Sequence, residues 1–177
     1  MKASIGVLGL ALGGLLVAGA AYDSPAPVSD ALRSAAERAQ RNLVAAAEEM
    51  PADKYGFKPT PAQMSFGQVI GHLAGGNDFL CARIGGVEAP KRSPAGKDAS
   101  KQELVDRLKE SFKFCDTALA QTNDAKLDAK VPFFEGGDVT RATAMFAAAE
   151  DWADHYSQLA IYLRLNGLLP PTAKQKS

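Results

Sequence analysis

The chain has 177 residues, of which 46% are hydrophobic, and its 20 Lys and Arg residues balance its 20 Asp and Glu residues. This length corresponds to one domain that can bury a substantial core. The zero net charge and the scatter of the basic residues argue against a nucleic-acid partner, because binding to a phosphate backbone requires a dense basic patch.

The first twenty residues have the pattern of a secretion signal. Met1-Lys2 is a short charged segment, an uncharged apolar run follows from Ala3 to Ala21, and the small residues around Ala20 suit a signal peptidase. An uncleaved membrane anchor is the alternative, although the run is rich in Gly and Ala and only one Lys flanks it. We expect cleavage after Ala20, a periplasmic or secreted location, and no membrane association of the mature chain.

The first two predicted helices are joined by a loop that is rich in proline. Apolar residues recur at helical spacing from Val28 to Met50, with Ser29 or Asp30 available as the N-cap. Pro51 ends this helix. A capping box of Ser and Gln, at positions 65 and 68, then opens a second helix that extends to about residue 85.

An exposed connection rich in Gly, Pro and Lys precedes a third helix, which a second capping box of Ser100 and Glu103 opens. An irregular segment follows over residues 123–140, in which residues 131–134 are expected to form a short extended piece. The fourth helix runs from near residue 140 to Asn166, and Gly167 ends it. Four helices without a set of alternating strands predict an all-α, antiparallel four-helix bundle.

The chain contains two cysteines, Cys81 and Cys115, on the second and third predicted helices. In an oxidising compartment an even count permits a disulfide, which would add roughly 3 kcal/mol of stability for a loop of this length. The alternative is a pair of small buried side chains, because free cysteine is commonly buried. The sequence favours the disulfide slightly and does not fix the distance between the two helices.

Both histidines of the chain stand on predicted helices. Asp151 and His155 are four residues apart, so both side chains lie on one face about one turn apart, and His72 lies in the middle of the second helix. Facing helices of a bundle build metal sites from such residues, and three ligands leave an open coordination position. The alternative is that Asp151 only orients His155 through a hydrogen bond.

The neighbours of this pair have simpler interpretations. Trp152 and Tyr156 are expected to pack in the bundle rather than to stack on a ligand, and Glu150 and Asp154 are expected to face water. The sequence offers no nucleophile and base outside the three candidate ligands. Any catalysis would therefore have to take place at the metal site.

Two stretches of the chain resemble the DinB-like superfamily of four-helix bundles. They are "MPADKYGFKPTPAQMSFGQVIGHLAGGNDFLC" from Met50 to Cys81 and "DHYSQLAIYLRLNGLLPP" from Asp154 to Pro171. The resemblance follows the same order along essentially the whole mature chain, and these two stretches are its most specific parts. The resemblance implies one bundle domain over residues 21–172, between the signal peptide at 1–20 and a polar tail at 173–177.

The resemblance also implies a divalent metal that is bound by three histidines, one on the second helix and two on the fourth. His72 and His155 match the first and last of these positions, whereas the middle position is Asp151. A carboxylate binds zinc, nickel, iron or manganese, so the pattern can survive as two histidines and one carboxylate. It is equally the pattern of a site that has lost its metal.

Family members with known activities include thiol-dependent transferases and isomerases, and metal-dependent hydrolases. The resemblance therefore implies a small-molecule substrate, although an exported chain would be separated from a cytosolic thiol. A non-catalytic periplasmic binding or stress-associated bundle with a vestigial site is the alternative. Bundles with broad apolar faces commonly dimerise, so a homodimer is compatible with the sequence.

Overall fold

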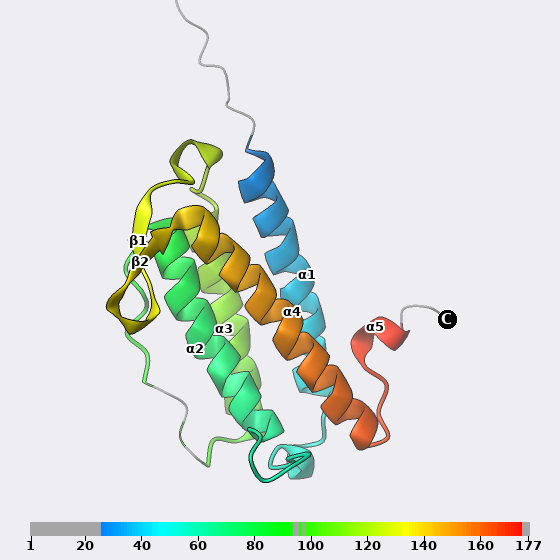
Figure 1. The fold of residues 1–177 in the computed structure, drawn as a ribbon. Helices are drawn as coiled ribbons and strands as arrows, with labels where there is room; N and C mark the ends of the chain where they lie inside the picture. Colours follow the sequence, from blue (N-terminus) through cyan, green and yellow to red (C-terminus); the bar gives the residue numbers. More distant parts are fainter. Residues whose placement is uncertain (1–25, 94–95, 97, 175–177) are drawn as a thin grey trace, which may run out of the picture.

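The computed structural model describes residues 26–93, 96 and 98–174. Four long helices pack side by side (Figure 1), which confirms the all-α bundle. They are α1 (Pro27–Glu49), α2 (Phe66–Gly85), α3 (Lys101–Leu119) and α4 (Arg141–Leu165). The predicted signal peptide lies outside the described residues, and no helix in the described part of the chain is long and apolar enough to cross a membrane.

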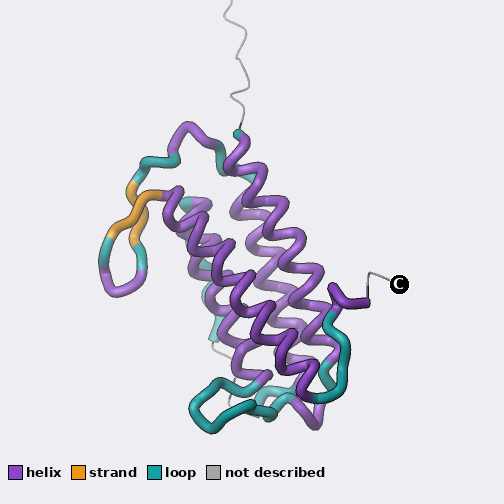
Figure 2. Tube along the Cα trace, turned by 45° about the vertical axis from the view of Figure 1, so that its right-hand side comes forward, coloured by secondary structure: helices purple, strands orange, loops and turns teal. Residues whose placement is uncertain are grey.

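Short elements occupy the connections between the helices. The expected extended piece is the first strand of a two-stranded antiparallel hairpin, in which Val131 pairs with Val139. Figure 2 shows this hairpin projecting from the bundle at the end where α1 begins. The short elements are η1 (Ala52–Lys54), η2 (Asp124–Lys126), β1 (Lys130–Pro132), η3 (Phe134–Gly136), β2 (Asp138–Thr140) and α5 (Pro171–Lys174).

The expectation of an all-antiparallel bundle is wrong for α2 and α3. Asn77 bonds Ser111, and Cys81 forms a disulfide with Cys115, so positions rise together along both helices and the two helices run in the same direction. The physical reason is the long connection over residues 86–100. An extended chain of that length reaches about 50 Å, whereas α2 has 20 residues and is about 30 Å long, so the chain returns along the whole bundle before α3 begins.

The remaining contacts fix the directions of the other helices. On α4, Trp152 bonds Asn77, whereas Tyr162 bonds Met64 just before α2, so α4 runs antiparallel to α2. At the start of α3, Lys101 bonds the last carbonyls of α1, so these two helices are also antiparallel. Each of α2 and α3 therefore has one parallel and one antiparallel neighbour. His72 and the Asp151 side chain thus come from antiparallel neighbours.

The helix ends follow the sequence with one exception. Both predicted capping boxes form, before α2 and before α3. The predicted caps of α1 are wrong, because this helix already begins at Pro27 and its own N-cap residue makes no side-chain bond. Instead, Asp124 accepts hydrogen bonds at 2.9 Å from the backbone N–H groups of Val28 and Ser29. The cap is supplied by a residue nearly a hundred positions away, which local patterns do not reveal.

The core is closely packed where α2 meets α3. The disulfide joins Cys81 and Cys115 across this contact, with their Cα atoms 5.1 Å apart, as the sequence favoured. At Gly85 an added Cβ would lie 2.5 Å from the carbonyl oxygen of Ala118, so only glycine permits this approach of the two helices. The α2 and α3 pair is therefore joined by a covalent bond and by a close backbone contact.

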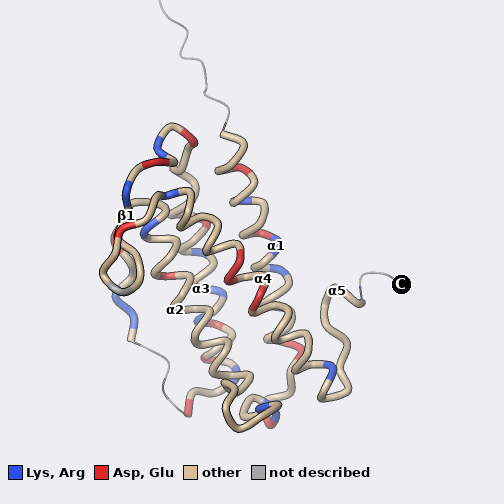
Figure 3. Tube along the Cα trace, in the orientation of Figure 1, with Lys and Arg blue, Asp and Glu red and all other residues tan. Residues whose placement is uncertain are grey.

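Charged residues of both signs are spread over the four long helices. Figure 3 shows Lys and Arg interspersed with Asp and Glu along the helices and connections of the described part of the chain. A chain with this distribution presents no extended basic face there. The expectation that the protein has no nucleic-acid partner stays a prediction, as do the expected domain boundaries.

Candidate metal centre

The structure brings together the three residues that the sequence singled out. His72 lies near the middle of α2, and Asp151 and His155 lie one turn apart on the neighbouring α4. Each offers one ligand atom, and these atoms all lie within 4.8 Å of one another. The two imidazole rings are 5.0 Å apart between their centroids. Two antiparallel helices thus bring three side chains that can bind a metal to one place.

His155 is held in a defined orientation. Its side chain is buried, and its Nδ1 lies 2.7 Å from the backbone oxygen of Asp151 and 3.3 Å from Oδ1 of the same residue. Nδ1–H therefore donates to Asp151, and the lone pair of Nε2 is left available for a metal, which is the usual arrangement of histidine ligands. The bond to the Asp151 side chain raises the pKa of His155, and it outweighs burial, which lowers the pKa.

Asp151 has one carboxylate oxygen that nothing in the described structure satisfies. Oδ1 faces His155, whereas Oδ2 is buried and has no hydrogen-bond partner among the described residues. Leaving a buried acceptor unpaired costs about 1 to 3 kcal/mol, and more when it is charged. Opposite this oxygen stands Gly76 of α2, where an added Cβ would lie only 3.6 Å from Oδ2. A cation is the kind of group that would satisfy this oxygen.

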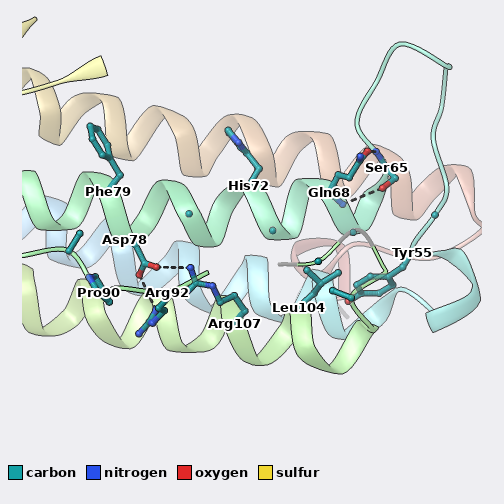
Figure 4. Close-up of a pocket in the computed structure, with 17 residues that line it drawn as sticks. Tyr55, Ser65, Gln68, His72, Asp78, Phe79, Pro90, Arg92, Leu104 and Arg107 are labelled. Atoms are coloured by element: carbon teal, nitrogen blue, oxygen red, sulfur yellow. Dashed lines mark hydrogen bonds and ion pairs between the residues drawn. The ribbon is translucent and has the colours of Figure 1, made fainter. Parts of the chain in front are cut away.

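His72 completes the set from the solvent side. Its side chain is exposed, so the ring can rotate toward the other two ligands without disturbing the core. Figure 4 shows it projecting from α2 toward α4, whereas Asp78 and Arg107 lie between α2 and α3.

The three residues fit a divalent metal in number, chemistry and reach. Zinc bonds of 2.0 to 2.2 Å hold tetrahedral ligand atoms about 3.4 Å apart, so the observed separations require a closure of no more than about 1.4 Å. Rotation of the exposed His72 ring supplies such a movement. Two imidazoles and one carboxylate suit zinc, iron, nickel or manganese, and three protein ligands leave an open position for a substrate.

The neighbours of the candidate ligands lie as the sequence indicated. Trp152 is buried and donates from its indole nitrogen to Oδ1 of Asn77 at 2.7 Å. Tyr156 is half-buried and donates to the hydroxyl of Thr172 at 2.9 Å. Glu150 and Asp154 are exposed. None of these four side chains therefore competes with Asp151 as a ligand.

Sequence reasoning missed a cavity of about 780 Å³ between α2, α3 and the connection that joins them. His72 is one of its lining residues. At its polar end Asp78 pairs with Arg92 and Arg107, at 2.9 Å in each case, as Figure 4 shows. The one sequence signal was the recurrence of glycine at every fourth position of α2, at residues 67, 71 and 75, which leaves that helix face without side chains.

A model of the DinB superfamily matches residues 35–159, which is more than half of the chain. Among curated proteins, none matches this chain at a significant level. A solved DinB-like protein from Bacillus subtilis is 20% identical, with a TM-score of 0.64 over 77% of this chain and 92% of that one. A DinB-like protein from Bacillus cereus is 15% identical, with a TM-score of 0.64 over 81% and 93%.

A mycothiol-dependent maleylpyruvate isomerase also has a similar structure. It is 14% identical, with a TM-score of 0.57, and the match covers 74% of this chain and 60% of that one. At such identities the likeness to solved structures establishes the fold alone. The support for a metal site in this chain is therefore the geometry of His72, Asp151 and His155.

Proposed function

Because the chain belongs to the DinB superfamily, we propose that it binds one divalent metal ion through His72, Asp151 and His155 and catalyses a metal-dependent transferase or hydrolase reaction. The observation that carries the proposal is the buried Oδ2 of Asp151, which lacks a partner in the described structure and lies beside two imidazoles. A hydrogen-bonded pair alone would account for Oδ1 and leave Oδ2 unexplained. A cation accounts for both oxygens.

When bound, such an ion acts as a Lewis acid that lowers the pKa of a thiol or water at its open position. The residues of the chain determine how strongly this effect operates. Asp151 would bring a negative charge that three neutral imidazoles would not bring, so it would weaken this effect relative to a three-histidine site. The Nδ1–H bond to the Asp151 carbonyl fixes the His155 ring and leaves Nε2 available to the ion.

The choice between transferase and hydrolase depends on where the chain works. One structural neighbour is named as a mycothiol-dependent isomerase, which favours a small thiol as cosubstrate if the chain stays in the cytosol. We propose export instead, on the pattern of residues 1–20 and on the Cys81–Cys115 disulfide, which is stable in oxidising compartments. An exported chain is separated from cytosolic thiols, and this separation favours hydrolysis.

Export has a direct test. The intact mass of the protein recovered from its native cell should correspond to a chain that begins at Ala21. A mature chain that retains Met1, or a protein found only in the cytosol, would overturn the proposal and restore the thiol-dependent reaction as the leading candidate.

The metal proposal is tested by elemental analysis of the mature chain, purified without a histidine tag. Near-stoichiometric metal is expected in the parent and should be lost in Asp151→Ala and in His155→Ala. Ser157→Ala, an exposed change on the same helix, is the matched control and should retain the metal. If the parent stays empty after incubation with zinc, iron, manganese and nickel, the site is vestigial and the protein is a non-catalytic binding bundle.

A further inference from the structure

The cavity beside the candidate metal centre has the properties of a ligand site. Its volume lies in the range of small-molecule pockets, and its lining is mostly apolar. The apolar lining includes the rings of Tyr55 and Phe79, together with Pro90 and Leu104. The floor is the glycine face of α2, where an added Cβ at Gly75 would meet nothing within 4 Å. The space above that face is therefore open to a ligand.

The polar end of the cavity offers the guanidinium of Arg107 as a donor, and its carboxylate, Asp78, is ion-paired although Oδ2 accepts no hydrogen bond in the described structure. Asp78 has a side chain only 9% exposed, and its two oxygens are taken by Arg92 and Arg107. Arg92 also lies 3.9 Å from a carboxylate oxygen of Glu110, which is not part of the lining. Arg107 instead keeps a buried Nη1 that has no hydrogen-bond partner in the described part of the chain. A ligand group that satisfies this nitrogen must accept hydrogen bonds.

The two ends of the cavity are separated by a fixed distance along α2. Asp78 follows His72 by six residues, which corresponds to about 9 Å along the helix axis. Between them the helix presents Gly75 rather than a side chain to the cavity. A ligand with one end at Arg107 can therefore lie along the glycine face and bring its other end to the rim formed by His72.

We propose that this cavity binds an elongated carboxylate with an apolar body, whose carboxylate pairs with Arg107 and whose other end lies at His72. A carboxylate matches the planar fork of a guanidinium better than a neutral acceptor does. The apolar body contacts Phe79 and Leu104 and the bare backbone of α2. The role of the second end as a reacting group rests on the proposed metal function, whereas carboxylate binding does not.

The first experiment titrates the purified, metal-free protein with decanoate in an isothermal calorimeter. Decanoate is expected to bind at one site, and decanol at least about tenfold more weakly, because it lacks the charge that pairs with arginine. Absence of decanoate binding at millimolar concentration, or equal binding of decanol, overturns the proposal.

Two substitutions at one position test the location of the ligand. Gly75→Leu fills the open space, whereas Gly75→Ala adds one methyl group, and both residues favour a helix more than glycine does. Decanoate binding should weaken at least about tenfold in Gly75→Leu and change less than about twofold in Gly75→Ala. Equal binding by the two variants would place the ligand elsewhere.

Arg107→Gln tests the polar end and should weaken decanoate binding about tenfold while leaving decanol binding unchanged. An unchanged preference for decanoate over decanol in this variant contradicts the assignment of Arg107. If Arg107→Gln does not fold, the Gly75 pair still decides the proposal.

Zinc titration of the same samples separates the two hypotheses. Decanoate binding without zinc binding would remove the metal function and keep the cavity assignment. Zinc binding without decanoate binding would keep the metal function and remove the cavity assignment.

Discussion

Two polar clusters join α2 to α4, and they differ in how completely their groups are satisfied. In the first, the Asn77 side chain donates to Ser111 at 3.0 Å and accepts from Trp152 at 2.7 Å. All three of its members are neutral and buried. The second cluster is His72, Asp151 and His155, with one exposed ring and one buried oxygen without a partner in the described structure.

The difference separates a structural cluster from a functional one. Trp152 and Asp151 are adjacent on α4. The indole N–H of Trp152 has a buried partner in Asn77, whereas Oδ2 of Asp151 is buried without a partner in the described structure. A buried polar group that is fully paired specifies how helices pack. A buried charge that is half-paired persists only where something else, such as a bound ion, completes it.

The largest expected effect comes from removing the disulfide that lies one turn beyond Asn77. Replacing both cysteines with alanine should lower the free energy of unfolding by about 3 to 4 kcal/mol, because the bridge closes a loop of 34 residues. Urea unfolding of the oxidised parent and the double variant measures this loss. Zinc affinity should not change, because neither cysteine lies among the candidate ligands. If the double variant also bound zinc more weakly, the geometry of the second cluster would depend on the packing of α2 against α3.

The next effect distinguishes the clusters through a ligand. At a free zinc concentration about 100 times the Kd, the parent should gain about 2.7 kcal/mol of unfolding free energy. Asp151→Asn should gain much less, because the amide has lost the charge that binds the ion. Thermal unfolding with and without zinc measures both gains. Equal gains in the two proteins would show that zinc binds elsewhere.

A smaller loss is expected when the first cluster is broken. Asn77→Ala leaves the Trp152 N–H and the Ser111 hydroxyl without their partner, which should cost about 2 kcal/mol of unfolding free energy. Metal-free samples of this variant and of Asp151→Asn should be compared by urea unfolding. Asp151→Asn should lose less than about 0.5 kcal/mol, because it removes a group that is only half-paired. Similar losses would contradict the distinction between the clusters.

The smallest effect is a pH dependence of the metal-free protein. Asp151 raises the pKa of His155 above its ordinary value of 6.5, so its contribution to stability is fully present below that value. The contribution is lost as the pH rises through the higher, folded-state pKa. Unfolding at about pH 6 and about pH 8.5 should show this loss in the parent and a smaller one in Asp151→Asn. Zinc affinity should change in the opposite direction, because a proton competes with the metal for His155.

The sequence predicts local features well where the information is local. The capping boxes before α2 and α3 and the stop at Gly167 place three helix ends because each depends on neighbouring residues. The cap of α1 by Asp124 and the parallel direction of α2 and α3 depend on tertiary packing. A periodic pattern does not contain this information, since a 15-residue connection can turn back or cross over.

The candidate site shows the same division. The spacing of Asp151 and His155 places them on one helix face, whereas the convergence of His72 depends on the pairing of α2 with α4. The general rule that facing helices of a bundle build metal sites suggested that convergence, the resemblance to a known family also implied it, and the structure brings the three side chains together. The Asp78 and Arg107 pair was not predicted, because its residues lie on helices that the sequence alone does not place side by side.

The most direct test of the central claim is a crystal structure of the protein grown with zinc, with data collected at the zinc absorption edge. A single anomalous peak is expected between α2 and α4, about 2.0 to 2.2 Å from Nε2 of His155, a ring nitrogen of His72 and Oδ2 of Asp151. A site that shows no peak, with Oδ2 of Asp151 bonded to water or to His72, would contradict the account. It would make the second cluster a hydrogen-bonded relic of a metal site.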